Sequence, residues 1–381
     1  MLKKNYSFLF FPVLLLLSCF LLDKVFTLPW IQENFISWNR IEPVVYESRL
    51  SLLDDLLKSP DLDKIKSGEK KLVVIFGSSR AASIENRKIE ELDDRLVVYN
   101  FCVPFPGISY FYYLLSLFQN QNIPITTLVL EVDPFLLSLS GHQYPDMYSY
   151  DIPFYFKHSD LWWEGQYDPW KSEGKGFSGT EFLNYFFRRN FYVFRYPFAV
   201  KAYSENNSFI DVVWKGEVQK KKKKYLRENY QNLLMDINRT NRGGLVNLSQ
   251  EAKTDSELSL DAELKFQRYI GRHYRESDSQ IKFLKKFIDY SGENSDRVLF
   301  ITLPISDQLK KKLLKAEIDD SYIEKKFRSL KVRTKMNYLN YLEIPMHCNK
   351  FEDGFHLDGS CYSEVTDLLI SKLKNLNILN N

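Results

Sequence analysis

An apolar, β-branched run ends abruptly in a polar turn at Val73-Val74-Ile75-Phe76-Gly77-Ser78-Ser79-Arg80. A helix-compatible segment follows the turn. α/β enzymes hold a nucleophile at junctions of this kind, because the turn lifts one side chain above the carboxyl edge of the sheet and the free N–H groups of the helix favour negative charge there. Ser79 is therefore the candidate nucleophile. The alternative is a strand-to-helix turn whose serines only cap the helix.

Five short, almost wholly apolar runs along the chain are expected to be strands. They cover residues 72–76, 96–101, 127–132, 298–303 and 338–344. Segments with a helical pattern lie between and around them: residues 41–59, a charged helix from the Ser79 turn to about 92, 108–119, a helix from 281, a Lys-rich helix ending near 328 and a terminal helix. Apolar strands that alternate with helices are typical of a parallel sheet covered on both faces. The predicted fold class is therefore α/β.

The alternation breaks in the middle of the chain, between residues 135 and 276. This part contains aromatic clusters such as Trp162-Trp163, the lysine run Lys220 to Lys224 and the loop-like Gly243-Gly244. No hydrophobic period persists in it, so we interpret it as an insertion that caps the sheet. The predicted division is a membrane anchor or signal segment at 1–27, a juxtamembrane helical stalk at 28–70, the first half of the α/β domain at 71–134, the aromatic-rich cap at 135–276 and the second half at 277–381.

The amino terminus contains an apolar run from Tyr6 to Leu22, preceded by two lysines. Its length of roughly 17 residues is at the lower limit for crossing a bilayer, and the lysines favour a cytoplasmic amino end with the main domain outside, on the periplasmic side. An uncleaved transmembrane anchor is favoured because no small-x-small cleavage site follows the run. Leu16-Leu17-Ser18-Cys19 resembles a lipobox, so a lipoprotein with lipidated Cys19 is the next alternative, and a cleaved signal peptide is the third.

Composition limits the classes of partner and cofactor. The 381 residues are 44% hydrophobic, which supports a sizeable core, and the net charge of +3 gives no case for nucleic acid. There is no Walker-type loop or GxGxxG, and the histidines and four cysteines lack metal spacing, so neither a cofactor nor a metal is expected. Cys348 and Cys361 either form a disulfide in an oxidising compartment or remain free thiols.

A second motif, Asp353-x-x-His356, lies just before the terminal helix. A serine near neutral pH needs a base to take its proton, and an imidazole needs a carboxylate to hold its tautomer and stabilise the imidazolium that forms. In a doubly wound sheet, the loop after the first strand and the loop before the last helix can meet at the carboxyl edge. The order of the two motifs therefore predicts a Ser79–His356–Asp353 relay, against the alternative of an ordinary surface pair between Asp353 and His356.

Gly77-Ser78-Ser79, Gly107 and Asp353-x-x-His356 together resemble the SGNH (GDSL-type) hydrolase superfamily, over residues 71–134 and 280–378. The nearest resemblance is to its membrane-anchored, exported branch, with the DltD-like and alginate O-acetylation proteins. The chain also resembles a group of spirochaete proteins with a domain of unknown function. The resemblance implies a three-layer, flavodoxin-like sheet. It makes Ser79 the nucleophile, His356 the base and Asp353 its partner, with the N–H groups of Ser79 and Gly107 as the oxyanion hole.

The chain departs from the superfamily pattern at two places. Ser78 replaces the usual Asp of the Gly-Asp-Ser triplet, which the DltD-like branch tolerates. Glu131-Val132-Asp133-Pro134 stands where a Gly-x-Asn-Asp block would supply an oxyanion-hole Asn, so the hole is one donor short. Two further residues are open: Arg80 either binds an anionic substrate group or pairs with a nearby acid, and Asn100 either lines the site or caps a turn.

The expected function is acyl transfer through a Ser79-acyl intermediate in an exported, membrane-tethered enzyme. A cell-envelope glycan or lipid acyl ester is the expected substrate, and the branch resemblance implies a membrane-bound O-acyltransferase as partner. An esterase or deacylase, in which water takes the acyl group, is the rival within enzymes. A catalytically silent scaffold or glycan-binding protein on the same fold is the rival from another class, and the missing Asn block is its main support.

Overall fold

The computed structural model describes residues 7–25, 42–104, 106–138, 233–245, 252–270, 274–293, 297–330 and 337–375, with 154, 157, 158, 161, 187 and 191 as isolated positions. It divides into two compact units, of which one comprises Met1–Pro43 with Phe177–Leu233 and the other Val44–Gly176 with Leu234–Asn381. The aromatic clusters around Trp162 and Trp170 and the lysine run at Lys220 lie outside the described residues.

The first unit contains helix α1, Ser7–Val25, which includes Pro12. Most of its described side chains are exposed. The ring of Phe20 packs edge to face against the ring of Phe191 in the same unit, with centroids 5.8 Å apart. Among the residues described, no helix combines the length and the apolar character needed to cross a membrane. The anchor at residues 1–27 therefore stays a prediction.

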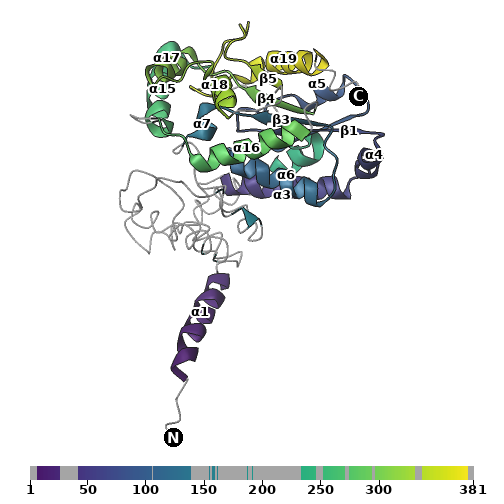
Figure 1. The fold of residues 1–381 in the computed structure, drawn as a ribbon, viewed down its shortest axis with the longest axis vertical. Coiled ribbons are helices and arrows are strands. Elements are labelled where there is room, and N and C mark those ends of the chain that lie inside the picture. The colour runs from purple at the N-terminus through teal and green to yellow at the C-terminus, as the bar shows by residue number, and fades with distance from the viewer. Residues whose placement is uncertain are drawn as a thin grey trace, which may run out of the picture. The chain divides into compact units, whose positions relative to one another are not determined.

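The second unit is built on a parallel sheet of five strands. They are β1 (Lys71–Phe76), β2 (Leu96–Asn100), β3 (Thr127–Glu131), β4 (Val298–Thr302) and β5 (Asn337–Asn340). Their order across the sheet is β2-β1-β3-β4-β5, and every neighbouring pair is parallel (Figure 1). The α/β class and the parallel sheet predicted from the sequence are confirmed. β5 is shorter than the predicted strand and partly exposed, because it lies at the edge of the sheet.

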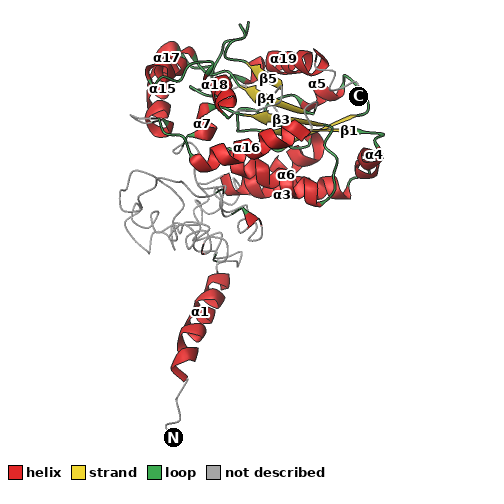
Figure 2. Ribbon diagram, viewed as in Figure 1, coloured by secondary structure: helices red, strands yellow, loops and turns green. Residues whose placement is uncertain are grey.

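Helices cover both faces of this sheet, as the sequence predicted (Figure 2). The helices of the second unit include α3 (Glu42–Lys58), α4 (Asp61–Ser67), α5 (Asn86–Glu90), α6 (Ile108–Asn120), α7 (Pro134–Leu137), α15 (Asp255–Tyr269), α16 (Asp278–Glu293), α17 (Asp307–Lys315), α18 (Tyr322–Ser329) and α19 (Tyr362–Asn375), with a 3-10 turn at Gly359–Cys361. Residues 234–241 are also helical. In Figure 1, α3, α6 and α16 lie on one side of the strands, and α5 and α19 lie on the other.

Apolar spacing explains why the covering helices pack as they do. In α16, Phe283, Leu284, Phe287 and Ile288 form one buried face, since residues four apart share a helix face. Across the sheet, Val365, Leu369 and Leu373 of α19 join the core that β1, β2 and β4 build. α3 buries Leu52 and Leu56 against this domain, so the carboxyl half of the predicted stalk packs on it.

Two helix predictions were wrong. The predicted helix directly after the Ser79 turn does not form there: residues 79–84 are turns and α5 begins only at Asn86. The Lys-rich segment before Arg328 is two helices, α17 and α18, because the chain adopts a left-handed conformation at Glu317 (φ 62°), which a helix cannot continue through.

The order of the strands brings two loops together. β1 lies between β2 and β3. The connection from β1 to β2 therefore runs over one face of the sheet, and the connection from β2 to β3 runs over the other face. Ile75 of β1 pairs with Val129 of β3, and Phe76 pairs with Leu130. The loops that follow β1 and β3 therefore emerge side by side at the carboxyl edge, which is where ligands bind in open parallel sheets.

Candidate active site

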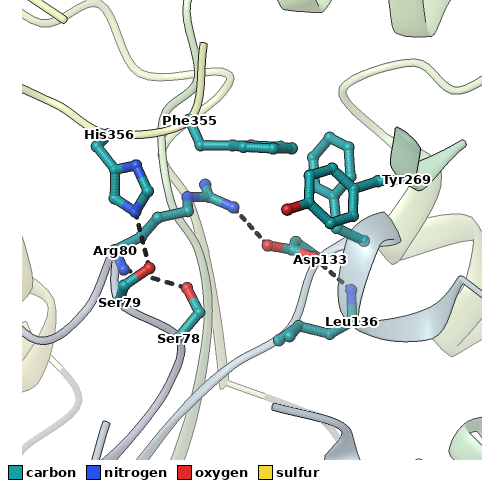
Figure 3. A pocket seen from close by; sticks show the side chains of 9 residues that line it. Ser78, Ser79, Arg80, Asp133, Leu136, Tyr269, Phe355 and His356 are labelled. Carbon is teal, nitrogen blue, oxygen red and sulfur yellow. Dashed lines mark hydrogen bonds and ion pairs between the residues drawn. The ribbon is translucent and has the colours of Figure 1, made fainter. Parts of the chain in front are cut away.

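The Gly77-Ser78-Ser79 turn follows β1 at this carboxyl edge. Ser79 Oγ lies 2.7 Å from Nε2 of His356, although the two residues are 277 positions apart in sequence (Figure 3). His356 Nδ1 lies 3.0 Å from both carboxylate oxygens of Asp353. A tautomer with its proton on Nδ1 donates to this carboxylate and leaves Nε2 to accept from the Ser79 hydroxyl. The structure thus places the three predicted residues in one hydrogen-bonded chain.

A short hairpin carries Asp353 and His356. We call residues 351–357 the His356 hairpin; Phe351 and Leu357 form an antiparallel bridge at its base. Within it, Asp353 Oδ1 accepts hydrogen bonds from the backbone N–H of Phe355 (2.7 Å) and of His356 (2.8 Å). The carboxylate therefore folds back onto its own loop. This local turn is why two residues between Asp and His suffice to put the carboxylate on the ring.

The charge of Asp353 is held by its surroundings. Lys265 Nζ lies 3.1 Å from Oδ2 of Asp353, and both side chains are about four-fifths shielded, with exposed fractions of 20% and 19%. Burial raises the pKa of the Asp353 carboxyl, but the hydrogen bonds with His356 and the charge of Lys265 outweigh burial and hold this pKa well below its ordinary value. Asp353 is thus ionised at neutral pH, as an orienting partner for an imidazole must be.

Ser78, beside the candidate nucleophile, is bound to the buried side chain of Glu131 at the end of β3. The Ser78 N–H donates to Glu131 Oε2 (2.6 Å) and the Ser78 hydroxyl donates to Oε1 (3.0 Å). The same hydroxyl accepts from the Arg80 N–H at 3.2 Å, which closes the turn. A β-carbon on Gly77 would lie 2.8 Å from Glu131 Oε2 and 2.5 Å from Ala81 Cβ, so only glycine fits at this position.

Glu131 has no exposed surface. Burial raises the pKa of its carboxyl to about 7, and the nearby Arg80 guanidinium opposes the rise. Arg80 is itself buried, with Nη1 on the carboxylate of Asp133 and 3.5 Å from Glu131, and Nη2 on the carbonyl oxygen of Leu303. Of the two alternatives left open for Arg80, the structure shows pairing with an acid, although Arg80 also lines the pocket beside Ser79.

Sequence reasoning missed the roles of Glu131 and Asp133. It treated Glu131-Val132-Asp133-Pro134 only as a departure from the superfamily pattern. Asp133 accepts from the Leu136 N–H (2.8 Å) and so caps α7 as well as binding Arg80. The signal was present: an acidic residue that ends a wholly apolar strand must be buried, and a buried carboxylate requires partners.

A small pocket opens between the Ser79 turn and the His356 hairpin (Figure 3). Four of its nine lining residues are apolar or aromatic: Phe135, Leu136, Tyr269 and Phe355. The rings of Phe135 and Phe355 meet edge to face, with centroids 4.4 Å apart. The half-buried candidate nucleophile therefore shares its pocket with both apolar and charged side chains.

Asn100 and Gly107 are not among the residues that line this pocket. Asn100 Nδ2 donates to the carbonyls of Ala81 (3.1 Å) and Ala82 (3.3 Å), and its Oδ1 accepts from the Cys102 N–H, so Asn100 caps a turn. Gly107 is buried at the first position before α6. Its role in an oxyanion hole stays a prediction. The Ser79 N–H makes no hydrogen bond to any described residue, which leaves it available to a ligand.

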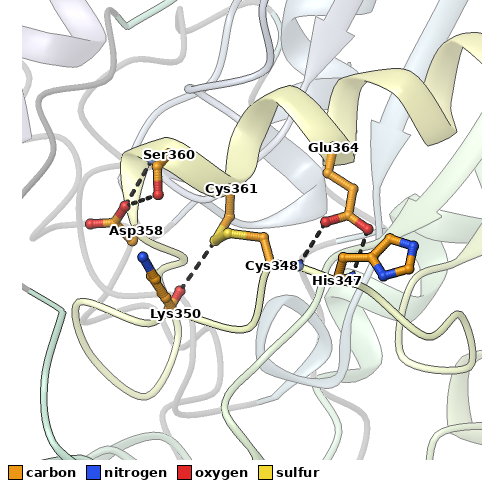
Figure 4. Close-up of a disulfide and its surroundings, with 7 residues drawn as sticks. All are labelled: His347, Cys348, Lys350, Asp358, Ser360, Cys361 and Glu364. Atoms are coloured by element: carbon orange, nitrogen blue, oxygen red, sulfur yellow. Dashed lines mark hydrogen bonds between the residues drawn. A yellow bond between two sulfur atoms is a disulfide. The ribbon is translucent and has the colours of Figure 1, made fainter.

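A disulfide closes the loop that contains the His356 hairpin. Cys348 and Cys361 are bonded, with Cα atoms 5.3 Å apart (Figure 4), so the first of the two alternatives for these cysteines is the one observed. The Glu364 carboxylate accepts from the N–H groups of His347 and Cys348, both at 2.8 Å. The base of the hairpin is therefore fixed covalently and by α19. Within the described part of the chain, no group of three or more His, Cys, Asp or Glu residues is placed to hold a metal ion.

Comparison with known proteins gives one result. No curated protein and no solved structure matches the chain. A family model described as protein of unknown function (DUF1574) matches residues 1–373. Because this match spans nearly the whole sequence, the chain belongs to the DUF1574 family.

Proposed function

We propose that this protein is an SGNH-like serine acyl-ester enzyme that acts through a Ser79-acyl intermediate. The observation that carries the proposal is the continuous chain from Ser79 Oγ through His356 to Asp353, with contacts of 2.7 and 3.0 Å. The strand order β2-β1-β3-β4-β5 supports it, because this is the order of flavodoxin-like sheets, which the SGNH resemblance implies.

The chemistry proceeds in two halves. In the first half, Ser79 Oγ attacks the carbonyl carbon of an acyl ester while His356 Nε2 takes the hydroxyl proton. Collapse of the tetrahedral intermediate then breaks the ester C–O bond, and His356 gives the proton to the leaving alcohol. In the second half, water or an acceptor hydroxyl gives its proton to His356 and attacks the carbonyl carbon of the Ser79 ester. Collapse of this second tetrahedral intermediate breaks the bond between the acyl carbon and Ser79 Oγ, and His356 returns the proton to Ser79. Asp353 stabilises the imidazolium in both halves.

The Ser79 N–H is the proposed first donor of the oxyanion hole, since no described residue occupies it. Gly107 N–H is the proposed second donor. The Ser78 N–H is excluded from this role because Glu131 already binds it. The proposed hole therefore takes one backbone donor from the turn itself, and a hole of this kind works only when its donors are fixed in advance.

The apolar residues of the pocket support an acyl substrate. Phe135, Leu136, Tyr269 and Phe355 offer apolar surface to an uncharged acyl chain, and Asp133 and Arg80, which also line the pocket, are paired with each other. We propose that the acyl chain lies against these apolar residues while its carbonyl carbon faces Ser79.

We further propose that the enzyme is exported and held at the membrane by its amino-terminal segment, with a cell-envelope glycan or lipid as acyl donor or acceptor. The apolar run between Tyr6 and Leu22 and the Cys348–Cys361 disulfide support export, because disulfides persist in oxidising compartments. A membrane-bound O-acyltransferase is the proposed partner, by the resemblance described above. The silent-scaffold alternative is less favoured, since a scaffold does not require the Ser79–His356 contact.

Hydrolysis of a small activated ester tests the proposal. Wild-type protein is expected to hydrolyse p-nitrophenyl acetate, and Ser79→Ala is expected to lose at least about 10³-fold in kcat/KM because the nucleophile is gone. Ser329→Ala is the comparison variant, since it makes the same change at an exposed serine of α18 that does not line the pocket. A Ser79→Ala protein as active as wild type, or an inactive wild type, would favour the scaffold.

A further inference from the structure

Helix α15 comes from the segment that sequence analysis assigned to the cap, yet it contacts the His356 hairpin directly. Asp261, Lys265 and Tyr269 are four residues apart, so they project from one face of the helix. Each meets a different residue of the hairpin. Asp261 Oδ2 accepts from the Gly354 N–H at 2.7 Å, Lys265 Nζ donates to Asp353 Oδ2 at 3.1 Å, and the Tyr269 and Phe355 rings meet with centroids 5.5 Å apart.

The fit between helix and hairpin is close. A β-carbon on Gly354 would lie 3.3 Å from Asp261 Oδ2 and 3.6 Å from Ala262 Cα, so the hairpin backbone lies within van der Waals reach of the helix. Lys265 Nζ also lies 5.4 Å from the centroid of the Phe355 ring. Its charge is therefore shared between a carboxylate and the face of an aromatic ring.

The helix is itself anchored. A capping box between Thr254 and Glu257 fixes its first turn. Ala262 and Tyr269 belong to one buried cluster with Leu309 and Leu313 of α17, and Phe355 of the hairpin lies in the same cluster. α15 is thus a rigid support, and what it supports is the loop that carries Asp353 and His356.

We propose that Lys265 is a positioning residue for Asp353, and that α15 sets the geometry of the relay. Asp353 Oδ1 is fixed by two backbone N–H groups of its own loop, but Lys265 is the described side chain other than His356 that binds Oδ2. Without Lys265, the described residue that still contacts Oδ2 is His356, the ring that the carboxylate has to orient. The catalytic consequence rests on the function proposed above, whereas the effect on the Asp353–His356 hydrogen bond does not.

Three variants separate this role from a structural one. Lys265→Met keeps the length of the side chain and its helix propensity but removes the charge. Lys265→Arg restores a cation. Glu263→Gln removes a different ion pair of the same helix, the one with Lys312, and leaves the hairpin contacts in place. All three are compared with wild type by thermal unfolding, so that a loss of global stability is distinguished from a local change at the His356 hairpin.

Two measurements are made on each variant. The first is the downfield proton resonance of the His356 Nδ1–H, assigned by its absence in His356→Ala, which reports the hydrogen bond to Asp353 without turnover. The second is p-nitrophenyl acetate hydrolysis. For Lys265→Met, the resonance is expected to shift or broaden and kcat to fall about 10-fold with KM within about twofold, because only the transition state depends on the relay. Lys265→Arg is expected to recover both, and Glu263→Gln to resemble wild type.

A Lys265→Met protein with an unchanged resonance would overturn the positioning role, whatever its activity. Equal effects of Lys265→Met and Glu263→Gln would overturn it too, since they would report general weakening of α15. A shifted resonance in a chain that hydrolyses no ester would uphold the positioning role and contradict the proposed function instead.

Discussion

Replacing Asp353 by asparagine is expected to lower kcat for ester hydrolysis by about 10⁴-fold, by analogy with the loss of the carboxylate in a Ser-His-Asp triad. The amide oxygen of Asn can still accept from the N–H groups of Phe355 and His356, so the hairpin is expected to keep its shape. The amide N–H₂, however, cannot stabilise an imidazolium, and it favours the tautomer whose proton sits on Nε2. His356 then cannot take the Ser79 proton.

The matched control is Glu352→Gln, which makes the same chemical change at the neighbouring residue. Glu352 donates its backbone N–H to the carbonyl oxygen of His356, which Gln keeps, and the His356 ring is bound by Asp353, so this variant is expected to stay within a few-fold of wild type. Circular dichroism and thermal unfolding should match for both variants. An Asp353→Asn protein that retains a tenth or more of wild-type kcat would contradict the relay.

Replacing Glu131 by glutamine is expected to change how stability depends on pH. Gln is the neutral isostere of the carboxyl and can keep both contacts with Ser78. Because the folded-state pKa of Glu131 is raised from 4.5 to about 7, this group stabilises the fold fully below pH 4.5 and loses that contribution as pH rises through about 7. The lost contribution is about 3 kcal/mol at most, from the size of the shift.

The measurement is the free energy of unfolding of both proteins by urea between pH 4 and 8. The free energy of unfolding of wild type minus that of Glu131→Gln is expected to fall as the pH rises across this range, mainly between pH 4.5 and 7. Arg80 and Asp133 are present in both proteins, so the difference between the two proteins reports the titration of Glu131. A difference that rises with pH would mean that Arg80 stabilises the Glu131 carboxylate more than burial penalises it.

The sequence was sufficient to predict the sheet and the relay. The four inner runs β1 to β4 are short, mostly apolar and wholly buried, such as Leu72 to Phe76, and such runs have few other ways to be buried. The meeting of Ser79 with His356 followed from the rule that loops at the carboxyl edge of a parallel sheet converge. Neither inference needs knowledge of side-chain packing.

The supports of the relay depend on tertiary contacts that no local pattern encodes. Lys265 and Asp261 lie in a segment without a persistent period, and their partners are near residue 353, so neither could be assigned from sequence spacing. The missing helix after Ser79 has a similar origin. Ser78 and Glu131 hold that turn by side-chain hydrogen bonds, which compete with helix formation. The amino-terminal anchor and most of the cap remain predictions.

The most direct test of the account is whether Ser79 carries the acyl group. Wild-type protein is mixed briefly with p-nitrophenyl acetate, quenched in acid, digested and mapped by mass spectrometry, in parallel with His356→Ala. The account predicts an acetyl group on the peptide that contains Ser79 in the wild type, and none at that position in His356→Ala. Acetylation found only on lysines, or equally on Ser78 and Ser79 in both proteins, would contradict a Ser79-acyl intermediate.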